Sequence, residues 1–158
     1  MVLIQQSTNS ETLAELTEGV QSLHNSIAPD KFKPFDKQAF KNHFDSLFEK
    51  EGNYALLATI EGSPVGYLFY NIQHSKENAF FYSSSDIYLN FIAVLDQHKR
   101  QGIANRLMKE LKQIAVKEKV QNITLSVWTQ NSSGRDFFKK MGFEEFRQNQ
   151  ELKVKKSI

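Results

Sequence analysis

The sequence contains no cysteine, a single tryptophan and only three prolines among its 158 residues. Without cysteine, disulfide bonds, thiolate metal sites and cysteine nucleophiles are excluded. No apolar run approaches the roughly 20 residues of a membrane-spanning helix, and the first ten residues lack the basic and apolar pattern of a signal peptide. We therefore expect a cytoplasmic protein that uses no metal and has no membrane partner.

An excess of charge of one sign is also missing, since 20 basic residues face 18 acidic ones and the net charge is +2. A protein that binds nucleic acid by neutralising phosphates usually has a clearer excess or a basic face. A nucleic-acid-binding domain built on Lys99, Arg100, Arg106 and Lys109 is therefore the least favoured function, and we expect no nucleic-acid partner. The length fits a single domain with a substantial core.

The hydrophobic pattern alternates between helical and strand-like segments. Strand-like segments cover residues 2–4, 54–60, 65–72, 87–95 and 123–128, and a final hairpin is expected from residue 143 onward. Helical spacing covers residues 13–23, a stretch after Asp36, residues 103–115, and a stretch between a cap at Asn131 or Ser132 and a stop at Gly142. This order predicts a mixed α+β domain with one central sheet.

The strand over residues 87–95 leads through a short polar loop directly into the most regular helix. The first backbone N–H groups of a helix have no intrahelical acceptor, and the helix dipole makes that end positive, so a phosphate or pyrophosphate can bind there. Gly102 lacks a Cβ and lets the backbone approach such a ligand closely, while Lys99 and Arg100 add positive charge. A solvated basic turn is the alternative explanation. The glycine spacing fits neither a dinucleotide fold nor an NTP-binding P-loop.

Two motifs in register extend this observation. The run Lys99-Arg100-Gln101-Gly102-Ile103-Ala104, after Val94-Leu95, resembles the acetyl-CoA-binding motif of the GNAT superfamily of N-acetyltransferases. The run from Asn131 through Phe138 to Gly142-Phe143 looks like the closing segment of that family. The resemblance covers nearly the whole chain. It implies one GNAT-like domain over residues 1–158, with a mixed, mostly antiparallel central sheet of six to seven strands and flanking helices.

The resemblance implies an N-acetyltransferase that transfers an acetyl group from acetyl-CoA to a primary amine by direct attack in a ternary complex. The central strand would contact the pantetheine arm, the loop and helix start would hold the pyrophosphate, and two residues of the closing segment would contact the arm and the sulfur. The implied cofactor-binding residues are Ile92, Ala93, Val94, Lys99, Arg100, Gln101, Gly102, Ile103, Ala104, Asn105, Asn131 and Phe138.

The sequence departs from the family pattern at both positions expected to be catalytic. Asn90 stands where several members place a glutamate base, and Phe138 stands where many have a tyrosine acid. An amide cannot take a proton at neutral pH, but a thiol with a pKa of about 8.5 can leave as thiolate. A water chain or another base would then serve; the alternatives are Tyr88, Asp86, Tyr82, His24 and His74. These departures also keep open a non-catalytic acyl-CoA-binding module or sensor.

The sequence predicts only the class of the acceptor, which is a small-molecule or peptide amine. His24, Phe32, Tyr82 and Tyr88 are the candidate substrate-binding residues, because they lie in the segments that border the acceptor side in the resemblance. Each has a plainer explanation: His24 as a surface or capping residue, and Phe32 as a staple between its loop and the core. One or two of the three consecutive aromatic residues at positions 80–82 are expected to contact the acceptor or a partner. A homodimer is compatible with the family.

Overall fold

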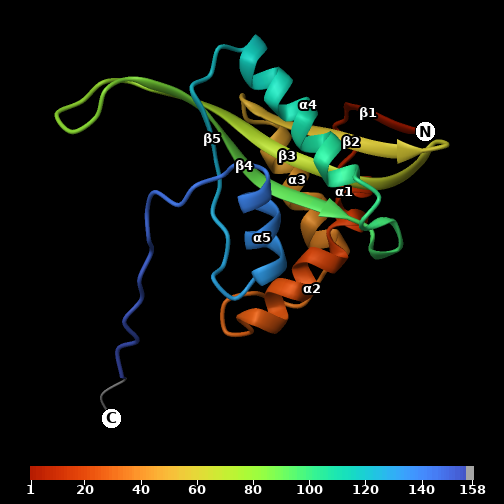
Figure 1. Cartoon of the computed structure of the whole chain (residues 1–158). Helices are drawn as coiled ribbons and strands as arrows, with labels where there is room; N and C mark the ends of the chain where they lie inside the picture. Colours follow the sequence, from red (N-terminus) through yellow and green to blue (C-terminus); the bar gives the residue numbers. More distant parts are fainter. Residues whose placement is uncertain (156–158) are drawn as a thin grey trace. The chain divides into compact units, whose positions relative to one another are not determined.

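The computed structural model describes residues 1–155. They form two compact units, one over residues 1–126 and one that starts at Val127. The first unit contains the sheet and four of the helices (Figure 1). Its elements are β1 (Val2–Gln6), α1 (Ser10–Leu16), α2 (Glu18–Ile27), α3 (Lys37–Phe48), β2 (Asn53–Ile60), β3 (Ser63–Ser75), β4 (Ser84–Val94), the 3₁₀ turn η1 (Asp96–His98), α4 (Ile103–Lys117) and β5 (Asn122–Thr124). The second unit contains α5 (Ser132–Lys140).

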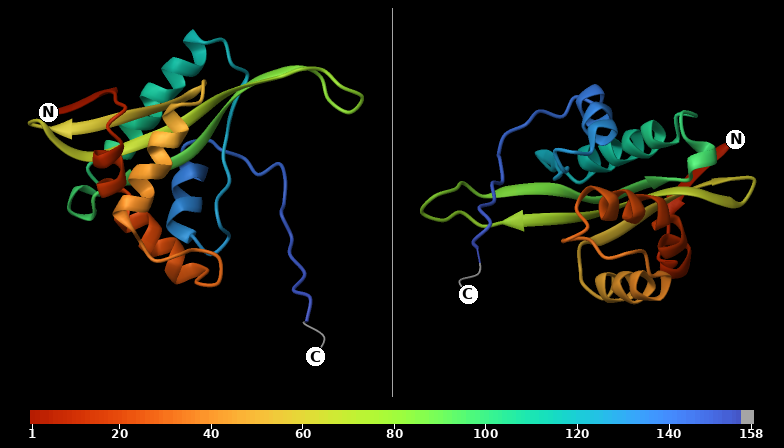
Figure 2. Two further views of the ribbon diagram at one scale, coloured as in Figure 1. Left: turned by 180° about the vertical axis from the view of Figure 1, so that it is seen from behind. Right: turned by 90° about the horizontal axis from the view of Figure 1, so that it is seen from below.

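The sheet has the strand order β1-β2-β3-β4-β5. The first four strands are antiparallel neighbours, and β5 alone runs parallel to its neighbour β4. The helix α4 covers one face of this sheet, and α1 and α3 lie on the other face (Figure 2). The expected hairpin of β2 and β3 is confirmed, and its turn contains Gly62 at φ +80°.

Phenylalanine fills the core between the sheet and α3. The fully buried ring of Phe44 lies 5.6 Å from Phe69 and 5.9 Å from both Tyr67 and Phe91, centroid to centroid. Phe48 adds a contact of 5.4 Å with Phe69. The opposite face is closed by the apolar stripe of α4, whose buried members are Ile103, Leu107, Met108, Leu111 and Ala115. The sheet is therefore held from both sides, and the strand β4 is fixed between them.

The helix expected over residues 13–23 is in fact two helices that meet at Thr17. The Thr17 hydroxyl donates to the carbonyl of Leu13 at 2.7 Å and lies 2.7 Å from the hydroxyl of Tyr67. Such a side-chain bond to the preceding turn competes with regular helix geometry and bends the chain. The apolar spacing alone could not reveal this break.

The prediction of six to seven strands is wrong, because the described residues form five. The strand expected over 123–128 is only three residues long, and the hairpin expected after Phe143 is absent from the part of the chain that the structure describes. Every residue from 144 to 155 is exposed, and the segment is dominated by Glu, Gln, Asn, Lys and Arg. Such a segment offers too little apolar surface to offset the entropy of ordering another strand.

Within residues 1–155, none of the helices combines the length and the apolar character needed to cross a bilayer.

Candidate functional site

The central strand β4 contains a β-bulge at Asn90. Phe69 of β3 lies opposite Phe91, while the next residue, Tyr70, lies opposite Leu89, so Asn90 is the extra residue of the pair. A bulge bends its strand and redirects the side chain it carries. The side chain of Asn90 is accordingly exposed, whereas Leu89 is buried and Phe91 packs against Phe44. The bulge thus brings the amide of Asn90 to the surface between the buried Leu89 and the partly buried Phe91.

One edge of β4 is open beyond this bulge. The short strand β5 pairs with β4 only over Asp86–Tyr88, and no strand among residues 1–155 pairs with that edge from Leu89 to Val94. The other edge of the same stretch is paired with β3. The expected cofactor-contacting residues Ile92, Ala93 and Val94 lie in this stretch. An extended ligand with amide groups can pair with such an edge as an added strand would.

The loop after β4 has an unusual backbone. Arg100 has φ +64° and Gly102 has φ +78°, so two residues in three adopt the left-handed conformation. A non-glycine residue there costs about 1–2 kcal/mol, and such strain concentrates at functional sites. No atom lies within 4 Å of the place that a Cβ on Gly102 would occupy. Gly102 is therefore selected by its dihedral angles and leaves an open space beside the start of α4.

Several backbone N–H groups around Gly102 have no acceptor among the described residues. The N–H of Arg106 makes the first hydrogen bond of α4, to the carbonyl of Gly102 at 3.0 Å. Within residues 1–155, no acceptor is bonded to the N–H groups of the preceding run, which consists of Arg100, Gln101, Gly102, Ile103, Ala104 and Asn105. Free N–H groups at the positive end of a helix bind anions. The row of free donors and the empty space over Gly102 fit a diphosphate.

The charged side chains of the loop are less free than the sequence suggests. Lys99 Nζ lies 2.9 Å from Asp96 Oδ1, and this contact lowers the pKa of the Asp96 carboxyl. Because both side chains are largely exposed, the pair is weak and can open for a ligand. The Nδ1 atom of His98 is buried and has no hydrogen-bond partner within residues 1–155. Sequence reasoning missed the left-handed Arg100 and this buried nitrogen, since neither leaves a signal in the residue pattern.

In the second unit, Asn131 is the N-cap of α5. Its amide oxygen accepts a hydrogen bond from the N–H of Gly134 at 3.0 Å. A Cβ on Gly134 would lie 2.5 Å from Asn131 Nδ2, so this glycine makes room for the capping amide. The same oxygen also accepts from Ser133 Oγ at 3.3 Å, so both of its lone pairs are used and any contact of Asn131 with a ligand would be made by Nδ2. Phe138 packs edge-on against Phe137 and Phe143, at 5.3 and 5.6 Å.

The acceptor-side candidates lie in different places. His24 stacks on Phe32 with ring centroids 4.8 Å apart, and burial lowers the pKa of its imidazole. The loop that carries Phe32 is tied to α2, since Asn25 Nδ2 donates to the Phe32 carbonyl at 2.7 Å. Tyr88 lies in β4 opposite Thr124. Tyr82 is exposed in the loop between β3 and β4, at the opposite end of β4 from Gly102.

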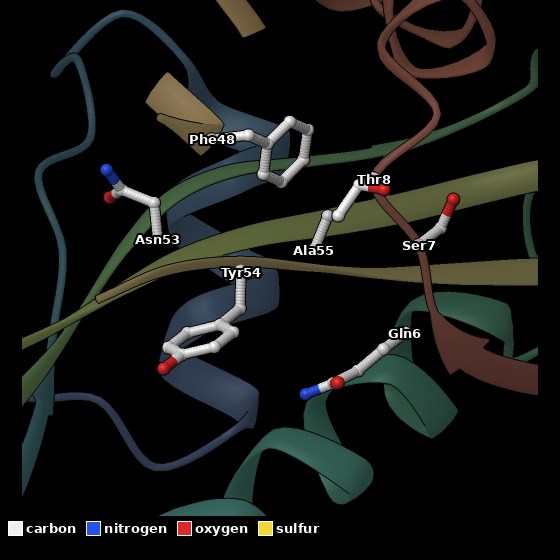
Figure 3. Close-up of a pocket in the computed structure, with 7 residues that line it drawn as sticks. All are labelled: Gln6, Ser7, Thr8, Phe48, Asn53, Tyr54 and Ala55. Atoms are coloured by element: carbon white, nitrogen blue, oxygen red, sulfur yellow. The ribbon is translucent and has the colours of Figure 1, made fainter. Parts of the chain in front are cut away.

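A small cavity of about 180 Å³ is lined by Gln6, Ser7, Thr8, Phe48, Asn53, Tyr54 and Ala55 (Figure 3). Its lining contains none of the residues expected at the site. Ligand pockets usually measure about 300–1,000 Å³ and hold a few convergent polar groups. This cavity is smaller, and its only titratable side chain is Tyr54. The loop before α4 and the open edge of β4 are therefore the candidate site of the first unit.

Comparison with known proteins gives a matching family and several similar folds. The model of the acetyltransferase (GNAT) family matches residues 20–143. The fold is similar to a tetramutant of the BH1408 protein from Bacillus halodurans, with a TM-score of 0.90 and 17% identity over 96% of this chain and 99% of that one. No curated protein sequence matches this chain.

Two further solved structures are enzymes. The aminoglycoside acetyltransferase meta-AAC0020, from an uncultured soil metagenomic sample, has a TM-score of 0.71 and 19% identity over 98% of this chain and 97% of its own. The aminoglycoside N-acetyltransferase AAC(6')-Iy in complex with CoA has a TM-score of 0.69 and 18% identity over 98% and 95%. Because the family model spans most of the chain, the protein belongs to the acetyltransferase (GNAT) family.

Proposed function

We propose that this protein is an N-acetyltransferase that transfers an acetyl group from acetyl-CoA to a primary amine. The observation that carries the proposal is the run of backbone N–H groups without an acceptor in the described part of the chain, from Arg100 to Asn105, which contains the left-handed Gly102. A diphosphate carries the charge and the acceptor atoms that such a run binds. The family match and the open edge of β4 support the same ligand.

In this proposal the first unit binds and orients the carrier. The N–H groups before α4 hold its diphosphate, and the backbone of Ile92, Ala93 and Val94 pairs with the amides of its arm. When bound, acetyl-CoA supplies an activated acyl group as a thioester. A backbone N–H near Ile92 would then donate to the acyl carbonyl oxygen and polarise it. Asn131 and Phe138 of the second unit are proposed to contact the arm and the sulfur end.

The acceptor amine must lose a proton before it attacks, because an alkylammonium has a pKa of about 10.4. Asn90 is exposed to solvent at the bulge. Its amide cannot take the proton, but it can hold a water molecule that passes the proton along a water chain to bulk solvent. We therefore propose that Asn90 positions a water rather than acting as the base itself.

The acceptor is proposed to be a small-molecule or peptide amine. The two aminoglycoside acetyltransferases with a similar fold favour small-molecule amines. His24, Phe32 and Tyr88 are the proposed acceptor-side residues, together with Tyr82 in the loop before β4. The His24 imidazole is held neutral by its lowered pKa and so would not repel a cationic acceptor.

Two measurements test the function. Acetyl-CoA at about 100 times its dissociation constant should add about 2.7 kcal/mol of stability, which raises the thermal midpoint by several degrees. A panel of polyamines, aminoglycosides, amino acids and peptides should then contain at least one amine that releases free CoA thiol in proportion to amide formed. The absence of any thermal shift would refute binding itself.

A second candidate function is an acyl-CoA-binding module without turnover, and the observation that favours it is the pair of substituted positions Asn90 and Phe138. This alternative predicts the same thermal shift but no thiol release with any amine of the panel. The two functions are thus separated by turnover and not by binding.

A further inference from the structure

A row of polar side chains on β4 leads to the bulge. Asp86 and Tyr88 are two residues apart, and successive side chains of a strand point to opposite faces, so these two share one face of the sheet. Both are partly buried. Asn90, the extra residue of the bulge, is exposed at the end of the row. The row lies on the face that carries Phe91, because the residues of β3 opposite these positions alternate regularly and are Gln73, Asn71 and Phe69.

The carboxylate of Asp86 is not balanced by a cation. The residues opposite Asp86 and Tyr88 on both neighbouring strands are neutral: Gln73, Asn71, Asn122 and Thr124. Within residues 1–155 the Asp86 carboxylate forms no salt bridge, and it accepts one hydrogen bond, from Asn122 Nδ2 to Oδ1 at 3.1 Å. Its other oxygen is therefore available to a ligand. A partly buried carboxylate has lost some of its hydration, and a cationic ligand would compensate for that loss.

Each side chain of the row matches one part of a linear amine. A carboxylate binds an ammonium group through a charge-assisted hydrogen bond. The ring of Tyr88 offers an apolar surface to a methylene chain, and its face attracts cations. Asn90 is the position at which, under the proposed function, the reacting amine loses its proton. The row thus provides an anchor for a cation, a surface for an alkyl chain and a place for the reaction, in this order.

The length of the row sets the length of the acceptor. A strand rises about 3.3 Å per residue, so the Cα atoms of Asp86 and Asn90 lie about 13 Å apart. The reacting amine must lie near the Asn90 end, because the acyl group is proposed to lie near Ile92. A short diamine cannot reach both ends of this row, whereas a long one can.

We propose that the acceptor is a long linear amine with a second ammonium group, which Asp86 binds while the first amine reacts beside Asn90. The inference rests on the proposed function and narrows its acceptor to one chemical class. Asp86 then acts as a substrate-binding residue and not as the base.

The chemistry of acyl transfer leaves the second ammonium group unchanged. The near ammonium first loses one proton to water and becomes a neutral amine. Its nitrogen then forms the C–N bond of the amide while the C–S bond of the thioester breaks. CoA leaves as the thiolate, and the second proton of the former ammonium passes through water to the solvent. The far ammonium stays protonated on Asp86 throughout.

The first test compares octylamine with α,ω-diaminooctane, which differ only by the second amino group. The wild type should have a kcat/KM about 10-fold or more higher for the diamine, through a lower KM, as expected for a hydrogen bond between charged groups. Asp86→Asn keeps the shape of the side chain and an oxygen for the Asn122 amide. It should reduce this ratio to the statistical advantage of two equal amino groups. Diaminopropane, which is too short for the row, should show no more than that advantage over propylamine.

The matched control is Glu61→Gln, which also replaces a carboxylate by its amide. Glu61 is exposed in the turn between β2 and β3, at the opposite end of β3 from Gln73, and this variant should keep the wild-type ratio. A charge reversal gives a second test. Asp86→Lys should lose the preference for the diamine and prefer ω-aminooctanoate, whose far end is a carboxylate, over octylamine. The thermal midpoint and its shift with acetyl-CoA show that each variant is folded and binds the carrier.

Four results would overturn the inference. They are a wild type that does not prefer the diamine, an unchanged ratio in Asp86→Asn, an unchanged preference in Asp86→Lys, and a loss with octylamine in Asp86→Asn as large as that with the diamine. The last result would identify Asp86 as the base. If the wild type acetylates other amines but does not prefer the diamine, the proposed function stands and only this inference fails. If acetyl-CoA binds and no amine of the panel reacts, both fail.

Discussion

The hydroxyl of Thr17 lies 2.7 Å from the hydroxyl of Tyr67, and both residues are almost completely buried, at 1% and 0% exposure. Since the Thr17 proton is donated to the Leu13 carbonyl, the Tyr67 hydroxyl is the donor to Thr17 Oγ1. Burial raises the pKa of Tyr67, so the phenol stays protonated and keeps this role over the whole physiological range. The junction of α1 and α2 is thereby attached to the middle of β3.

This pair predicts unequal costs of substitution. Tyr67→Phe removes one hydrogen bond and should lower the free energy of unfolding by about 1 kcal/mol. Thr17→Val leaves the Tyr67 hydroxyl buried without an acceptor and should cost more, about 1–3 kcal/mol. Urea denaturation of both variants and of the double variant measures the coupling. Equal and additive costs would show that the two hydroxyls do not interact.

The cap of α5 gives a second prediction. Gly134→Ala should push the Asn131 amide away, because the new Cβ would lie 2.5 Å from Nδ2, and loss of the cap should cost about 1 kcal/mol. The control is Gly19→Ala in α2, where no atom lies within 4 Å of the new Cβ. There the change should stabilise the protein by up to about 1 kcal/mol. In chemical denaturation the change in the free energy of unfolding should have opposite signs in the two variants. A change of the same sign in both would contradict the steric explanation.

Much of the fold could be predicted from the sequence, and the failures have local causes. The short apolar run of β2, which is buried from Ala55 to Thr59, and the helical stripe from Ile103 to Ala115 were both predicted from the pattern of apolar residues. The break at Thr17 depends on a tyrosine that is 50 residues away in the chain. The six to seven strands were implied by the family resemblance, and the last hairpin was expected from residue 143 onward, but Leu152 and Val154 of that segment remain exposed.

His24 predicts a pH dependence of stability. Burial lowers the pKa of His24 from its ordinary value of 6.5, so the unfolded chain binds this proton at a higher pH than the folded one. Its contribution to stability is therefore complete above pH 6.5 and is lost as the pH falls through that value toward the lowered pKa.

NMR titration of His24 should give a pKa below 6.5, and Phe32→Ala should raise it by opening the stacked ring to water. Replacing the imidazole by His24→Gln should flatten the stability profile in this acid range. An unshifted pKa in the wild type, or no response to Phe32→Ala, would contradict the assigned burial.

The bulge at Asn90 predicts a gain of function. If a base acts beside this position, Asn90→Glu supplies a carboxylate and should raise kcat/KM by about 10-fold or more at neutral pH, within the range of general base catalysis. The dissociation constant for acetyl-CoA should not change, because the diphosphate is held elsewhere. Asn42→Glu, the same change at an exposed position of α3, is the control. An unchanged kcat/KM in Asn90→Glu would place the base away from the bulge.

The candidate site could be predicted in its parts but not in its geometry. Gly102 was predicted to be part of the site because a glycine before a strong helix allows backbone angles that other residues avoid. Its φ of +78° lies in that left-handed region. The positive φ of Arg100 and the pairing of Lys99 with Asp96 could not be read, since both depend on three-dimensional placement. The roles of Asn131 and Phe138 toward a ligand remain predictions, as does a single domain over residues 1–158.

The most direct test of the account is the affinity for acetyl-CoA, measured by calorimetry, of the wild type, Gly102→Glu and Gly62→Glu. Both glycines have nearly the same positive φ, +78° and +80°, and both have open space at the Cβ position, so both variants carry similar backbone strain. Only Gly102→Glu places a carboxylate beside the diphosphate donors, and it should weaken binding by about 100-fold or more, while Gly62→Glu binds as the wild type does. Wild-type affinity in Gly102→Glu would contradict the central claim.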